Sequence, residues 1–141
     1  MGLILDTSVL IAAEKRRLDF YGLVNAAGGD AQDLHVCSIA ISELMQGVIR
    51  ANTDERRERR LRHARTVQAL CHVLPFDLAD AEHHARIWAD LASRGKMIGP
   101  YDLIIAATAL AREYTVATLN AGEFTRVTGL KVFDAIPWLI A

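Results

Sequence analysis

The stretch GLILDTSVLIAA, residues 2–13, begins as the apolar run of a buried strand and continues as a segment that can form a helix. Asp6 is the first charged side chain and lies where the run meets a Thr-Ser pair. A strand without polar side chains has no solvent face, which is typical of a parallel sheet covered on both sides. The stretch therefore predicts a carboxylate at the carboxyl end of a strand, where open α/β sheets bind their ligands.

Short apolar runs alternate with helical segments along the rest of the chain. The predicted strands are Leu3–Leu5, His35–Ser38, His72–Phe76, Thr115–Thr118 and Lys131–Phe133. The predicted helices are Ser8–Glu14, Asp19–Ala27, Ile39–Arg50, Asp54–Leu70, Ala79–Ser93 and Tyr101–Tyr114. This order predicts an α/β fold in which helices cover both faces of a central, mainly parallel sheet. Because the chain has 141 residues and no long linker, we expect a single domain over residues 1–141.

The composition favours neither a membrane protein nor a disulfide-rich one. The 16 Lys and Arg residues nearly balance the 17 Asp and Glu residues, so the net charge gives no support for membrane or nucleic-acid binding. Cys37 and Cys71 have no metal-ligand spacing and are typical of reduced, buried cysteines. The apolar N-terminal run is too short and too polar for a signal peptide, so we expect a cytoplasmic protein.

Two further acids lie in apolar surroundings. Glu43 is near the start of a predicted helix in AISELMQGV, residues 40–48, and Asp102 is the only charge in GPYDLIIAATAL, residues 99–110. An unpaired carboxylate on a buried helix is costly unless it is neutralised, paired or bound to a metal. Each acid also has a plain structural explanation, because Asp6 can cap the helix that follows it and Asp102 can complement a helix dipole.

Taken together, the three acids favour a metal site. Each follows a strand or loop near the start of a helix, and the carboxyl ends of parallel strands share one edge of a sheet. Clustered carboxylates repel one another unless a cation lies among them, and all-oxygen ligands suit Mg²⁺ or Mn²⁺. Such a metal supports phosphodiester hydrolysis without a protein nucleophile, since it activates water and offsets the phosphate charge.

Four segments in this order resemble the PIN-domain family, and in particular the VapC toxins of bacterial toxin-antitoxin pairs. They are LDTSVLI, SELMQG, GPYDLIIAATAL and TLNAGEF, which begin at residues 5, 42, 99 and 118. The resemblance covers essentially the whole chain. It implies a metal-dependent endoribonuclease with a three-layer α/β/α fold, which cuts RNA, forms a homodimer and binds a VapB-type antitoxin.

The resemblance also implies roles for residues at the matching positions. The metal-binding acids would be Asp6, Glu43 and Asp102, and Thr7 or Ser8 would help to orient water bound to the metal. The chain departs from the family in the fourth segment, because many relatives carry an Asp after the Thr that ends the fourth strand. Here Thr118 is followed by Asn120 and Glu123, and either can supply the fourth group. We assign the larger role to Glu123, since a neutral amide adds little attraction for a divalent ion.

Two other functions fit part of the pattern. A PIN-like module that has lost catalysis and binds nucleic acid or protein is compatible with the altered fourth segment. A response-regulator receiver also has a small α/β fold and Mg²⁺. It needs an acidic pair after its first strand, where this chain has Asp6 alone.

The remaining basic side chains and histidines carry weaker signals. Six arginines lie within ten positions and either engage phosphates or form a solvated helix face paired with Asp54, Glu55 and Glu58. They are Arg56, Arg57, Arg59, Arg60, Arg62 and Arg65. The adjacent His83 and His84 point to different sides of one helix. His35, His63 and His72 have no ligand spacing, so no histidine metal site is predicted.

Overall fold

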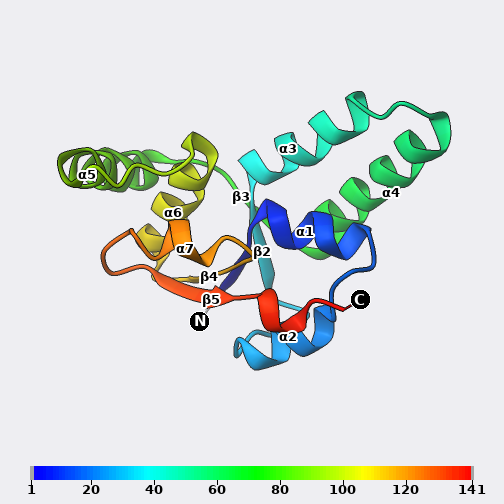
Figure 1. Ribbon diagram of the computed structural model, residues 1–141, viewed down its shortest axis with the longest axis horizontal. Helices are drawn as coiled ribbons and strands as arrows, with labels where there is room; N and C mark the ends of the chain where they lie inside the picture. The colour runs from blue at the N-terminus through cyan, green and yellow to red at the C-terminus, as the bar shows by residue number, and fades with distance from the viewer. Residues whose placement is uncertain (1, 141) are drawn as a thin grey trace.

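In the described part of the chain, residues 2–140 of this computed structural model, five strands form one parallel sheet. The strands are β1 (Leu3–Leu5), β2 (Leu34–Cys37), β3 (His72–Leu74), β4 (Thr115–Thr118) and β5 (Lys131–Asp134). Their order across the sheet is β3-β2-β1-β4-β5 (Figure 1). The predicted α/β fold with a central parallel sheet is confirmed.

Helices cover both faces of this sheet. They are α1 (Thr7–Glu14), α2 (Phe20–Ala26), α3 (Ser38–Ile49), α4 (Asp54–Leu70), α5 (Leu78–Arg94), α6 (Pro100–Arg112) and the one-turn α7 (Ala121–Phe124), followed by the 3₁₀ turn η1 (Ile136–Trp138). Figure 1 shows α1, α2 and α4 on one side of the sheet and α5, α6 and α7 on the other.

Two hydrophobic clusters, one on each face of the sheet, hold these layers together. Leu3 and Leu5 lie in one cluster with apolar residues of α1, α2, α3 and α4, while Ile4 lies in the other with residues of α5 and α6. Successive side chains of a strand point to opposite faces, so all three residues of β1 are buried. This burial on both faces is why the opening run contains no polar side chain.

The bounds of the predicted elements lie within two residues of the observed ones. β3 is among those that differ by two residues, because it ends at Leu74 rather than Phe76. Asp77 already begins α5, with a capping box in which its side chain and that of Asp80 each bond to the other's backbone N–H. Phe76 therefore lies in the connection, where it is exposed.

The strand order reverses between β1 and β4, the position at which open α/β sheets form a crevice beyond the strand ends. From β1 the chain proceeds outward to β2 and β3, and it then returns to β4 and β5 on the other side of β1. The helix that follows β1 packs in one hydrophobic cluster, and Phe124 of the helix that follows β4 packs in the other. The carboxyl ends of β1 and β4 therefore stay open between two diverging connections, which is where open α/β sheets bind ligands.

The two cysteines are free thiols in the structure. Cys37 ends β2 inside the core, and Cys71 is partly buried directly after α4. Within residues 2–140, no helix combines the length and the apolar character that crossing a membrane requires.

Candidate active site

Asp6 directly follows β1 and is buried, with 1% of its surface exposed. Its Oδ1 atom accepts hydrogen bonds from the Ser8 hydroxyl (2.5 Å) and the Val9 backbone N–H (3.3 Å), and its Oδ2 atom accepts one from the Thr118 hydroxyl (2.7 Å). Asp6 is thus the N-cap of α1, but the bond to Thr118 also ties it to the end of β4. Burial raises its pKa, and the hydrogen bonds partly oppose this rise.

Two hydroxyl groups fix the Asp6 carboxylate across the crevice. The buried Thr118 hydroxyl accepts a hydrogen bond from the Asn120 backbone N–H (2.8 Å), and the Ser8 hydroxyl accepts one from the Leu119 backbone N–H (3.0 Å). Because each hydroxyl already accepts from the backbone, its own hydrogen is directed to the carboxylate. Ser8 and Thr118 therefore orient Asp6, whereas the resemblance implied that Ser8 or its neighbour acts on water.

Glu43 lies in the second turn of α3, although the sequence predicts it near the helix start. A helix dipole acts within the first turn, so it does not explain this partly buried carboxylate. The Thr7 hydroxyl donates a hydrogen bond to its Oε1 atom (2.6 Å). Burial and the nearby charge of Asp6 raise the pKa of Glu43, and the bond from Thr7 opposes them.

Asp102 and Glu123 lie in the first turns of α6 and α7. Burial, a side-chain hydrogen bond with Glu123 and the charges of the other acids together raise the pKa of Asp102 to about 7. Two carboxyl groups can share a hydrogen bond only when one of them holds a proton. The contact thus reflects crowded negative charge, and the dipole alone does not account for Asp102.

The structure separates the two candidates in the fourth segment. Glu123 is among the groups that raise the pKa of Asp102, so it lies near that residue. Asn120 is exposed, and its side chain forms no capping hydrogen bond to α7. Its backbone N–H bonds to Thr118 instead. The geometry therefore favours Glu123 over Asn120 as the fourth acidic-site group.

Asp6, Glu43, Asp102 and Glu123, called the acidic site below, offer only oxygen ligands. The charges of the other three all raise the pKa of Asp102, so the four acids lie within electrostatic reach of one another. No three of these carboxylates, within the described residues, bring oxygens to within 4.8 Å of one another. Two oxygens on one Mg²⁺ lie at most about 4.2 Å apart, so at most two of these carboxylates can bind the same ion directly, and the others would act through its bound waters.

A basic pocket lies beside the acidic site, between the end of α1 and the arginine-rich face of α4. Its lining contains one acid and six cations: Glu14, Lys15, Arg16, Arg17, Arg56, Arg59 and Arg60. A neighbouring groove shares Glu14, Lys15 and Arg60 with this pocket and extends to Glu43. Among the described residues, the ion pair within α4 is that of Arg57 with Asp54. A solvated helix face with ion pairs between its own residues therefore accounts for only part of α4.

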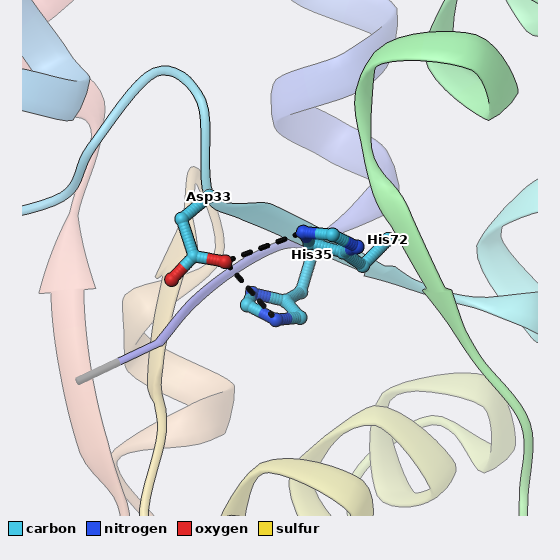
Figure 2. Close-up of side chains that lie close together, drawn as sticks. All are labelled: Asp33, His35 and His72. Carbon is cyan, nitrogen blue, oxygen red and sulfur yellow. Dashed lines mark ion pairs between the residues drawn. The ribbon is translucent and has the colours of Figure 1, made fainter.

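Three side chains gather at the opposite, amino edge of the sheet, where the sequence predicts no metal site. Figure 2 shows Asp33 facing His35 and His72, which come from neighbouring strands. Spacing along the chain did not indicate this cluster. His35 and His72 are partners in the register of β2 and β3, and that pairing alone brings them together.

This chain is similar to known proteins over most of its length. The PIN domain family matches residues 3–130. Ribonuclease VapC1 from Rickettsia felis is 35% identical over 137 residues, covering 94% of this chain and 95% of that protein. The tRNA(fMet)-specific endonuclease VapC from Shigella flexneri is 35% identical over 99 residues, covering 70% of this chain and 73% of that protein.

Solved structures show the same relationship in three dimensions. The DNA-bound VapBC complex from Salmonella typhimurium contains a chain with a TM-score of 0.83 and 30% identity, covering 95% of this chain and 98% of that one. For VapBC-5 from Mycobacterium tuberculosis, the TM-score is 0.79 and the identity 30%, with 94% and 98% covered. The PIN domain family matches this chain from residue 3 to residue 130, and the solved VapBC chains have the same fold. The chain therefore belongs to the PIN-domain family, among its VapC-type members.

Proposed function

We propose that this protein is the toxin of a VapBC-type toxin-antitoxin pair and cuts RNA as an endoribonuclease that depends on Mg²⁺ or Mn²⁺. Relatives that match almost the whole chain are named ribonucleases, and this supports the same activity here. The single observation that carries the metal dependence is the set of acids around Asp102. Burial, Glu123 and the charges of Asp6 and Glu43 together raise the pKa of Asp102, and a cation relieves such crowding of acids.

The acidic site would hold the cation, with Asp6 as its most rigid member. Three hydrogen bonds orient the Asp6 carboxylate, and one from Thr7 orients Glu43. When bound, the cation lowers the pKa of water and offsets the charge on phosphate oxygens. Asp102 must lose its proton before it can act as a ligand, so metal affinity should rise with pH up to about 7.

The basic pocket beside the acidic site would hold the RNA backbone. Its arginines supply positive charge within a short distance of Glu43, through the groove that the two surfaces share. Phosphate contacts of this kind position a nucleic acid without reading its sequence. The acidic site would thus bind the metal, and the basic pocket would bind the RNA backbone.

A VapB-type antitoxin is the partner that this proposal implies. Complexes of a toxin with its antitoxin are the solved relatives of this fold, including one bound to DNA. A homodimer, which the VapC resemblance implies, belongs to the same proposal, as does the cytoplasmic location expected from the sequence.

The decisive experiment is an RNA-cleavage assay with the purified protein over a Mg²⁺ and Mn²⁺ series. We expect cleavage with either ion and none in excess EDTA. Asp6→Asn and Asp102→Asn, purified identically, should lose at least about tenfold in rate, because loss of a ligand costs no less than disturbing the groups around one. Asp54→Asn is the matched control, since Asp54 also lies in the first turn of a helix but away from the acidic site.

Each alternative outcome has its own interpretation. If the wild type cleaves RNA equally well in EDTA while the Asp6→Asn preparation cleaves none, the metal mechanism is excluded. If the folded wild-type protein cuts no RNA at any metal concentration yet binds RNA, the chain is a binding module that has lost catalysis.

A further inference from the structure

The amino edge of the sheet carries a second set of side chains with metal-ligating atoms. Asp33 immediately precedes β2, His35 is the second residue of β2, and His72 is the first residue of β3. Parallel pairing sets the two histidines side by side, with ring centroids 5.0 Å apart. The Oδ1 atom of Asp33 lies 3.3 Å from Nε2 of His72 and 3.9 Å from Nε2 of His35 (Figure 2). Strands run from this edge toward the acidic site, so the two sets occupy opposite edges.

We propose that Asp33, His35 and His72 form a Zn²⁺ site that is separate from the acidic site. One ligand atom from each of the three residues lies within 4.8 Å of the others. In a tetrahedral site with bonds of about 2.0–2.1 Å, ligand atoms stand about 3.3 Å apart. The observed separations from Asp33 are close to this value, and the exposed side chains of Asp33 and His72 can adjust by the difference.

His35 is the buried residue of the three. It is 6% exposed, and its Nδ1 atom is the buried side-chain polar atom among residues 2–140 that has no hydrogen-bond partner. Its Nε2 atom is the one that faces Asp33, so Nε2 is the nitrogen that would bind the metal and Nδ1 would keep the proton.

The ligand set distinguishes this site chemically from the acidic one. Two imidazole nitrogens and one carboxylate suit Zn²⁺, whereas four carboxylates suit Mg²⁺ or Mn²⁺. Zn²⁺ would complete its coordination with water, because His72 and Asp33 face the solvent. It would join the edge strand β3 to β2 and to the loop that ends at Asp33. The site is proposed on this geometry alone and does not depend on nuclease activity.

The test measures Zn²⁺ binding by the full-length protein in excess Mg²⁺, which competes at the acidic site. We expect about one Zn²⁺ per chain by calorimetry, a raised melting temperature, and the visible absorption band of tetrahedral Co²⁺ when Co²⁺ replaces Zn²⁺. His72→Gln should weaken Zn²⁺ binding at least about tenfold and abolish the Co²⁺ band. Since His72 is exposed, this variant should retain the wild-type circular dichroism.

Two control variants make the result specific. His83→Gln removes another partly exposed histidine, from α5, and Asp102→Asn removes an acidic-site carboxylate. Both should bind Zn²⁺ as the wild type does. Equal Zn²⁺ affinity in the wild type and His72→Gln would overturn the proposal. So would loss of binding in Asp102→Asn, which would place Zn²⁺ at the acidic site, or an absence of Zn²⁺ binding by the wild type.

Discussion

Replacing Asp102 by Asn should stabilise the metal-free protein above pH 7. The pKa of Asp102 is about 7 in the folded chain, against the ordinary 3.8 of an exposed aspartate. A folded-state pKa above the unfolded one means that the folded chain binds the proton more tightly. The free energy of unfolding therefore decreases as pH rises from about 4 to about 7, and the full loss is present above pH 7.

The size of the effect follows from that difference. Each tenfold change in proton affinity is worth about 1.4 kcal/mol, so the full rise corresponds to an upper limit of about 4 kcal/mol. Asp102 is partly exposed and shares its hydrogen bond with Glu123, and solvent screening reduces the figure to about 1–2 kcal/mol. Asn can still donate to Glu123 without adding a charge. For a chain of this size, we expect a melting temperature higher by about 3–7 °C.

Thermal melts in EDTA at pH 5 and pH 8 provide the assay. Asp102→Asn should exceed the wild type at pH 8, and its advantage should shrink at pH 5, where Asp102 is protonated. Asp54→Asn removes an exposed first-turn acid and should lower stability slightly, by about 0.3–1 kcal/mol. A comparable loss in Asp102→Asn at pH 8 would refute the reasoning, because Asp102 would then act only on the helix dipole.

Three further predictions concern activity. Glu123→Gln should lower the cleavage rate at least about tenfold and require more Mg²⁺, while Asn120→Ala stays close to wild type; the reverse order would make the amide the fourth group. Thr118→Val keeps the side-chain shape but removes a hydrogen-bond donor to the buried Asp6 carboxylate, so it should lower the cleavage rate about 10–100-fold. Thr118→Ser should restore the rate. A wild-type rate in Thr118→Val would show that this hydroxyl does not position the site. Arg59→Gln should raise the KM for RNA with little change in kcat, whereas Arg65→Gln, outside the basic pocket, should not; equal KM values would remove the pocket from the substrate path.

Much of the fold was predictable because its signals are local. The opening run has no polar residue since β1 is buried on both faces, and this pattern is visible in the sequence alone. The acids at residues 6, 43 and 102 were also recognisable from the sequence, because the three together favour a metal site although Asp6 and Asp102 each have a separate structural explanation. The amino-acid sequence by itself thus indicated which segments form helices and strands, and it showed an unusual set of acids.

Contacts between distant segments were decided only by the tertiary structure. The sequence left Asn120 and Glu123 as alternatives, and the fold brought Glu123 near enough to Asp102 to raise its pKa. It also gave no sign that His35 and His72 are neighbours, because nothing in their spacing reports which strands pair. Strand order and register arise from burying both faces of the sheet at once, a condition on the whole chain that no single segment encodes.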